Sequence, residues 1–383
     1  MKQSAISSNI FLLFILLIST SALVSGIGVL SASIISAFQV LVSFAYLIIY
    51  AVRKESVEYS TVFLVLLSFL TIIVNQAPYM ISGTMMIIII TSVRHDEDLD
   101  IQYVLRYSAV ALSILFSVIL VLGYFNILPN HDISIWRIDH LVDRRALGFT
   151  HPNSTTLSWC GISMTWMLTK VKYERLKFMI LLLLTLGLYH FTYSRTSTYV
   201  IIAITATSFI YGDKIFRPVS RHLRYMSALI PVIFLIVSIA VLFLPYNSRI
   251  DALLSGRIAL YKQYYQSSGF SLLRDSELEN SMFDNGYLQS ILAKGILFAG
   301  ELMAIYIVIP LWVKKNPSRI SILTFSALCM IGFTETALQH FDILIPVVLG
   351  IYDSVFLPNQ VNESRAISRY SRDGQTSRPR LHN

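Results

Sequence analysis

Long apolar runs separated by short polar breaks dominate the sequence. A helix needs about 20 residues to cross ~30 Å of hydrocarbon, and runs of about that length recur along most of the chain. The pattern predicts an all-α, polytopic integral membrane protein with about twelve transmembrane helices, or ten to twelve because four runs are short. The runs lie at about 10–30, 31–51, 60–76, 78–93, 103–125, 154–171, 178–193, 196–212, 226–245, 286–312, 320–334 and 341–357.

Composition and charge support a membrane protein. Of the 383 residues, 55% are hydrophobic and only 14% are charged. Lysine and arginine collect in alternate loops, with 21 of the 30 on one side, which is the bias of cytoplasmic loops. We therefore expect both termini in the cytoplasm, and we attribute the net charge of +8 to topology and not to nucleic-acid binding. Cys160 and Cys329 fall in predicted spans without metal-ligand spacing, so we expect no disulfide framework or zinc site. We also expect no cofactor.

The chain is predicted to form one transmembrane domain over residues 1–358, followed by a disordered, basic cytoplasmic tail at 359–383. Two outer loops, about 126–153 and 246–285, are longer than the other connections. Long ordered loops on a rigid scaffold are where function concentrates. Candidate chemistry is therefore sought in these two loops and in the residues beside them.

The first outer loop ends in Arg-Arg-Ala-Leu-Gly-Phe-Thr-His-Pro-Asn, residues 144–153. Arg144 and Arg145 beside a helix N-terminus would make a cradle for a diphosphate, because a guanidinium donates two parallel hydrogen bonds and the helix end adds positive charge. Asn153 or Ser154 suits the helix cap. The alternative is a capping turn with solvated arginines.

Arg195 lies in a very short outer hairpin, Tyr-Ser-Arg-Thr, between two predicted spans. This position holds its guanidinium at headgroup level, near any lipid diphosphate. A simple positional anchor is the alternative explanation.

Arg257 lies in the second outer loop, where apolar residues from Ile250 to Tyr265 recur at three- and four-residue steps. This spacing predicts an amphipathic outer-face helix with Arg257 near the middle of its apolar stripe. A guanidinium there is costly unless it meets an anion. The alternatives are an arginine that snorkels to water and a salt bridge with Asp251 or Asp275.

Carboxylates complete the candidate site. Asp284, at the end of the second outer loop, could accept a proton from a hydroxyl nucleophile, although Asp284-Asn285 also suits a helix cap. Glu335 and His340 form a further outer pair that could hydrogen-bond to sugar.

Taken together, these motifs resemble the O-antigen and capsular polysaccharide polymerases, the Wzy group of the O-antigen ligase and polymerase superfamily. The resemblance covers roughly residues 100–345. It rests on four segments in order, at 144–153, 193–196, 255–257 and 284–288.

The resemblance implies a metal-independent, GT-C-like glycosyltransferase of the bacterial plasma membrane. Such an enzyme polymerises undecaprenyl diphosphate-linked oligosaccharide repeats into O-antigen, capsule or exopolysaccharide on the outer face. Donor and acceptor are both lipid-linked glycans, and a chain-length regulator is a candidate partner besides membrane lipids. The resemblance assigns Arg195 and Arg257 to the donor diphosphate. Asp284 stands where related ligases carry an activating histidine, with His151 as a competing base. We take Arg144, Arg145, Asn153, Asn285, Tyr287, Glu335 and His340 as candidate substrate-binding residues.

Two alternatives remain open. An O-antigen ligase would share the fold and the arginines, but aspartate in place of histidine at position 284 favours a polymerase. A polysaccharide or lipid-linked oligosaccharide transporter would place ionisable groups near the membrane midplane on several helices. Such groups are few in the predicted spans, among them His190, Lys294 and Glu301.

Overall fold

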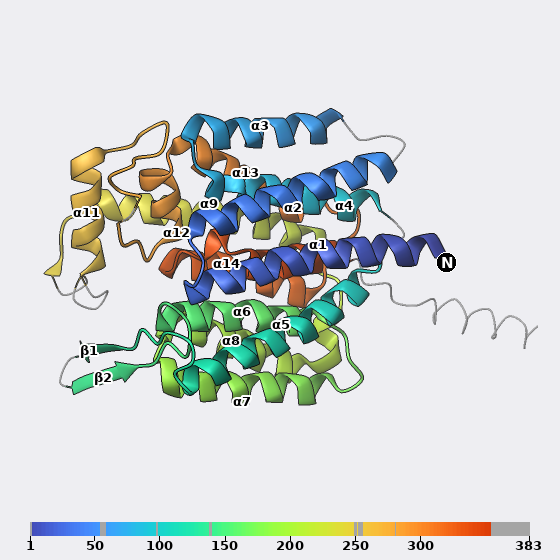
Figure 1. Ribbon diagram of the computed structural model, residues 1–383, viewed down its shortest axis with the longest axis horizontal. Coiled ribbons are helices and arrows are strands. Elements are labelled where there is room, and N and C mark those ends of the chain that lie inside the picture. The colour runs from blue at the N-terminus through green and yellow to red at the C-terminus, as the bar shows by residue number, and fades with distance from the viewer. Residues whose placement is uncertain are drawn as a thin grey trace, which may run out of the picture.

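Helices side by side in one bundle make up most of the protein (Figure 1). The computed structural model describes residues 2–53, 59–96, 99–137, 140–248, 251, 256–279 and 281–353. The tail predicted at 359–383 lies outside these ranges. The longer helices are α1 (Lys2–Ile27), α2 (Ala32–Arg53), α3 (Tyr59–Asn75), α4 (Ser82–His95), α5 (Ile101–Tyr124), α6 (Pro152–Leu168), α7 (Glu174–Thr192), α8 (Arg195–Tyr211), α9 (Arg221–Phe243), α11 (Arg257–Ser268), α13 (Ile296–Leu311), α14 (Arg319–Thr334) and α15 (Phe341–Tyr352).

Several helices are long and apolar enough, by length and composition, to cross a membrane, which supports the prediction of a membrane protein. In the described part of the chain these six segments are Ile6–Ile27, Ala32–Arg53, Ile101–Tyr124, Glu174–Thr192, Arg195–Phe216 and Arg221–Phe243. Shorter apolar helices lie at Thr61–Asn75, Pro78–Arg94, Ile296–Leu311, Arg319–Thr334 and Phe341–Tyr352.

Polar side chains fix the starts of several helices. The Asp100 carboxylate accepts a hydrogen bond from the Tyr103 amide at 2.9 Å, which caps α5. Ser220 and Ser318 cap α9 and α14 in the same way. Such caps satisfy backbone N–H groups that have no partner within the helix.

The bundle has two distinct ends. A two-stranded sheet, β1 (Ile133–Arg137) with β2 (His140–Arg144), lies with α11 at one end, here called the hairpin end (Figure 1). The start of α1 lies at the opposite end, here called the N-terminal end. Loops distant in sequence meet at the N-terminal end, where the Arg319 amide donates to the Arg217 carbonyl at 3.0 Å.

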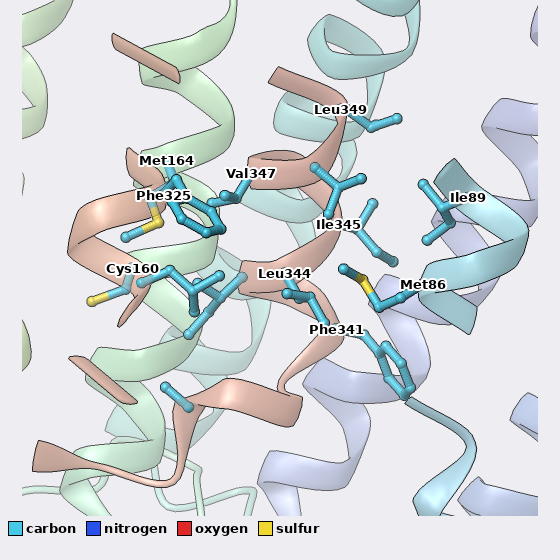
Figure 2. Close-up of a cluster of buried hydrophobic side chains, with 14 of the residues drawn as sticks. Met86, Ile89, Cys160, Met164, Phe325, Phe341, Leu344, Ile345, Val347 and Leu349 are labelled. Atoms are coloured by element: carbon cyan, nitrogen blue, oxygen red, sulfur yellow. The ribbon is translucent and has the colours of Figure 1, made fainter. Parts of the chain in front are cut away.

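Two helices form the centre of the core. Every residue of α15 is buried, and so are most residues of α6, which packs against it. Figure 2 shows α15 between its neighbours, with Val347 near Met164 of α6 and Phe325 of α14, and Ile345 near Met86 of α4. These two helices carry, at their starts, residues of the candidate site.

The sheet was not expected from the sequence. β1 and β2 pair antiparallel, with Ile133 opposite Arg144 and Arg137 opposite His140. The described residues are otherwise mostly helical, which is consistent with the predicted all-α membrane protein, and this small sheet is an addition within the loop predicted at about 126–153. The residues of β1, Ile-Ser-Ile-Trp-Arg, begin with the alternation of apolar and polar side chains that suits a strand.

The predicted span at 286–312 is not one helix. It begins with α12 (Gly286–Leu288) and a π-helical turn, η3 (Gln289–Ala293), and resumes only at α13. Gly295 separates the two parts at a φ of 89°, a conformation that L side chains rarely adopt. Three further short helices are η1 (Pro78–Ile81), η2 (Gly212–Phe216) and η4 (Ala337–Gln339).

Candidate functional site

A chain of hydrogen bonds at the hairpin end joins Arg144, Asn153 and Glu335. Arg144 ends β2 and is 8% exposed, and its Nε donates to the carbonyl of Thr192, the last residue of α7, at 2.9 Å. Its Nη2 donates to Oδ1 of Asn153 in the first turn of α6. The Asn153 Nδ2 in turn lies 3.3 Å and 3.2 Å from the two carboxylate oxygens of Glu335. Three segments distant in sequence, at 144–153, Thr192 and Glu335, therefore meet at one polar site.

Glu335 is the buried acid of this site. It follows the last residue of α14 and is 5% exposed. Burial raises the pKa of its carboxyl to about 7, and the nearby Asp284 charge adds to the rise. Arg257, Arg144 and the Asn153 hydrogen bond act in the opposite direction. A carboxyl with this pKa can take up or release a proton near neutral pH.

Arg257 and Asp284 form an ion pair beside Glu335. The Nε of Arg257 lies 3.0 Å from Oδ2 of Asp284, and both side chains are partly exposed. The Nη1 of Arg257 also donates to the carbonyl of Thr334 at 3.4 Å, immediately before Glu335 in the chain. The Asp284 amide donates to the Tyr261 hydroxyl at 3.1 Å, which ties this pair to α11.

The placement of Arg257 differs from the amphipathic-helix prediction. It is the first residue of α11, not a residue in the middle of a continuous helix, because Gly256 before it adopts a φ of 78°. Ile250 lies outside the described residues. Asp251 is not its salt-bridge partner, because that carboxylate accepts hydrogen bonds from the Ile258 and Ala259 amides.

His151 caps α6 next to this network. Its Nδ1 accepts a hydrogen bond from the Asn153 amide at 3.0 Å. Burial lowers the pKa of the imidazole, and the Arg144 charge lowers it further against the opposing effect of Asp284. The neutral ring therefore carries its proton on Nε2. In this state Nε2 of His151 can donate a hydrogen bond to a ligand. Its Nδ1 already accepts from the Asn153 amide and is therefore occupied as a proton acceptor.

Three predicted site residues lie beside the network without joining it. The Arg145 side chain is exposed, and its backbone amide donates to the Phe191 carbonyl at 2.9 Å. Arg195 begins α8 with an exposed side chain. The Nδ1 of His340 lies 3.7 Å from Oδ1 of the buried Asp342, beyond hydrogen-bond distance.

Asn285 and Tyr287 make hydrogen bonds within the protein. The side-chain Oδ1 of Asn285 caps α12 by accepting from the Tyr287 and Leu288 amides, and its Nδ2 donates to Ser238 at 3.0 Å. The Tyr287 side chain is fully buried, and its hydroxyl donates to the Cys329 carbonyl at 3.2 Å. Both side chains therefore position the start of α12.

The sequence argument missed Asp342. It lies in the first turn of α15 and is 2% exposed. A single carboxylate within an otherwise apolar run is the signal that could have identified it, because such groups are expensive in a membrane and mark functional or structural polar sites.

In the described part of the chain, no three histidine, cysteine, aspartate or glutamate side chains lie close enough to hold a metal ion. No family model, curated protein or solved structure matches the chain. Function is therefore inferred from the residues and geometry described above.

Proposed function

We propose that the protein is an integral membrane glycosyltransferase. In this proposal it transfers a glycan from an undecaprenyl diphosphate donor to a second lipid-linked repeat unit, and so polymerises a bacterial surface polysaccharide. The observation that supports it most is the single network of Arg144, Asn153, Glu335, Asp284 and Arg257 at the hairpin end. In this network two arginines lie close to a carboxyl group that can accept a proton. Transfer from a diphosphate donor needs both, cations for the leaving group and a base for the acceptor hydroxyl.

The proposed topology has twelve crossings with a GT-C-like arrangement. The six long helices and five shorter apolar helices account for eleven, and the largely buried α6 supplies the twelfth. Both termini are proposed to be cytoplasmic, because the loops at the N-terminal end carry most of the lysine and arginine. The hairpin end is then the outer face, where the lipid-linked substrates would lie.

The arginines are proposed to stabilise the leaving group. As the bond between the anomeric carbon and the diphosphate oxygen breaks, its electron pair stays on the oxygen and negative charge develops there. Guanidinium groups already held in place stabilise that charge without reorganising. The Arg257 side chain is held by Asp284, and the Arg144 side chain is held by Asn153. The exposed Arg195 and Arg145 are proposed to contact the second phosphate of the donor.

Glu335 is the proton acceptor that the geometry supports best. The Asp284 carboxylate is already engaged in the ion pair with Arg257, and the Nδ1 of His151 already accepts a hydrogen bond. The raised pKa of Glu335 matches a base that works near neutral pH. In the proposed step the acceptor hydroxyl attacks the anomeric carbon, its proton passes to Glu335, and the lipid diphosphate leaves.

Deletion of the gene tests the proposed reaction. Loss of a polymerase leaves single repeat units as the surface glycan. Loss of an O-antigen ligase instead strands long polymer on undecaprenyl diphosphate. Loss of a transporter traps repeat units on the inner face, and either of these two outcomes contradicts the proposal.

Complementation with variants tests the site itself. We expect Arg257→Ala and Arg195→Ala to remain in the membrane but to abolish long polymer. Lys262→Ala is the control for Arg257, since it removes a cation from the same helix, at a position that contacts the Leu244 carbonyl and not Asp284. Normal chain-length ladders from both arginine variants would show that these residues do not serve the reaction.

A further inference from the structure

A second polar pocket lies at the N-terminal end of the bundle, on the other side from the site described above. It has a volume of about 550 Å³ and is formed where α4, α13 and α15 end and where α5 begins. Four cations line it, Arg94, Lys170, Lys314 and Lys315. The carboxylates of Asp96, Asp100 and Asp353 line it as well.

Each of these carboxylates already accepts a hydrogen bond from the protein. Asp96 accepts from the Ser7 hydroxyl, and Asp100 from the Tyr103 amide. Asp353 accepts from Nε2 of Gln102 at 2.6 Å.

The hydrogen bonds of the Gln102 side chain fix the positions of the segments that line the pocket. Besides Asp353, its Nε2 donates to the Leu168 carbonyl at 3.1 Å, and its Oε1 accepts from the Lys170 amide at 2.9 Å. One side chain of α5 thus ties the ends of α6 and α15 together. Burial raises the pKa of the Asp353 carboxyl, and the Gln102 hydrogen bond acts in the opposite direction.

Two buried polar atoms at the pocket, one in Arg94 and one in Tyr352, lack a hydrogen-bond partner among the described residues. The guanidinium carbon of Arg94 lies 4.6 Å from the centre of the Trp312 ring, and its buried Nε is the first of these atoms. Tyr352 is 9% exposed, and its hydroxyl is likewise buried without a partner. A buried donor without an acceptor costs free energy that a ligand's oxygen would recover.

We propose that this pocket binds a phosphate-bearing ligand through Arg94 and Tyr352. A guanidinium can donate two parallel hydrogen bonds to two phosphate oxygens, and a tyrosine hydroxyl can donate to a third. The lysines add positive charge around the phosphate. The phosphate belongs either to the headgroup of an anionic lipid or to a soluble molecule, since both carry the same group. This site is independent of the proposed glycosyl transfer.

Binding to the purified full-length protein tests the site. Inorganic phosphate is titrated against chloride at constant ionic strength, with the melting temperature followed by a thiol-reactive dye that reaches the buried Cys160 and Cys329 only on unfolding. Phosphatidylglycerol binding is measured in parallel by native mass spectrometry, with phosphatidylcholine for comparison. Stabilisation by inorganic phosphate identifies a soluble ligand. Selective retention of phosphatidylglycerol identifies a lipid.

Matched variants decide whether Arg94 is responsible. We expect Arg94→Gln to weaken binding about tenfold or more, because charge-assisted hydrogen bonds to the phosphate are lost. Arg53→Gln removes the same charge from the exposed end of α2, and we expect its affinity to equal that of the wild type. If neither probe binds the wild type, or if Arg94→Gln binds as the wild type does, the proposal is wrong.

Tyr352→Phe provides a second variant in case Arg94→Gln cannot be purified. It removes only the unpartnered hydroxyl oxygen, so we expect the ligand-free protein to be at least as stable as the wild type. The ligand loses one hydrogen bond, and we expect its affinity to fall roughly threefold or more. Unchanged affinity in Tyr352→Phe would then overturn the assignment.

Discussion

Arg144 illustrates how a single buried cation can hold distant segments together. It is 8% exposed and donates both to the Thr192 carbonyl and to Asn153. We expect Arg144→Lys to destabilise the protein by roughly 1–3 kcal/mol, because one ammonium group cannot reproduce the two donors of the fork and leaves a buried acceptor unpaired. The fall in melting temperature of the purified protein measures this effect.

Arg145→Lys is the matched control for that prediction. The Arg145 side chain is exposed, and the contact of this residue with Phe191 is made by its backbone amide. We expect a change within about 0.5 kcal/mol, as for most surface substitutions. Equal destabilisation by the two variants would contradict the separate roles that the geometry gives to the paired arginines.

Glu335 links the candidate site to pH. Its folded-state pKa of about 7 lies above the ordinary value of 4.5, so the neutral carboxyl is the form that folding favours. Its contribution to stability is therefore complete below pH 4.5 and is lost as the pH rises through 7. The loss is on the order of 3 kcal/mol. We expect the melting temperature of the wild type to fall from pH 5 to pH 8, and this fall to shrink in Glu335→Gln.

The same substitution separates stability from activity. If Glu335 is the base, activity rises with pH through about 7 in the wild type, and Glu335→Gln abolishes polymer while making the protein more stable at pH 8. Glu277→Gln, at an exposed carboxylate of the second outer loop, should leave both measurements unchanged. An active Glu335→Gln protein would remove Glu335 from the mechanism.

The sequence indicated which residues belong to the candidate site more readily than which of them contact each other. Arg257 and Asp284 were both identified as site residues, but their ion pair was not predicted, and the salt bridges considered as alternatives for Arg257 were with Asp251 or Asp275. Glu335 is bonded to Asn153, which is 182 residues away in sequence, and not to His340. Residue type and local spacing carry no information on which distant helix ends meet, because that depends on how the whole bundle packs.

At the scale of elements, the break before α13 depends on one glycine. Gly295 has a φ of 89°, and a Cβ at this position would lie 2.5 Å from the backbone carbon of Leu273. We expect Gly295→Ala to destabilise the protein by about 1–3 kcal/mol or more, because strain in the left-handed region adds to the clash with fixed backbone. The melting temperature measures the loss.

Gly300→Ala is the corresponding control within α13. A Cβ there meets no atom within 4 Å, and alanine favours a helix over glycine. We expect a change between zero and about 1 kcal/mol of added stability. If both alanine variants behave alike, the backbone conformation of Gly295 is not what limits substitution.

Helices could be predicted from the sequence where the length of an apolar run determines them. The two consecutive spans expected at 178–193 and 196–212 are present as α7 and α8. Predictions failed where local geometry matters more than hydropathy. The β1–β2 sheet forms from a short alternation of apolar and polar residues within a polar loop. The start of α11 depends on the positive φ of Gly256.

At the scale of the whole molecule, the two ends of the bundle differ in chemistry. The N-terminal end carries the basic loops and the pocket that contains Arg94. The hairpin end carries the buried network of Arg144 and Glu335. Because lysine and arginine are retained on the cytoplasmic side during insertion, this asymmetry favours one orientation, in which the network faces outwards.

Labelling of single cysteines in intact cells tests that orientation. Both native cysteines are buried, so an exposed engineered thiol reacts over a low background. We expect Arg145→Cys at the hairpin end to react with a membrane-impermeant maleimide from outside. Arg53→Cys at the end of α2 should react only after the cells are permeabilised, which serves as the internal control. The reverse pattern would place the network in the cytoplasm, where outer-face lipid-linked glycans cannot reach it, and would rule out the proposed polymerisation.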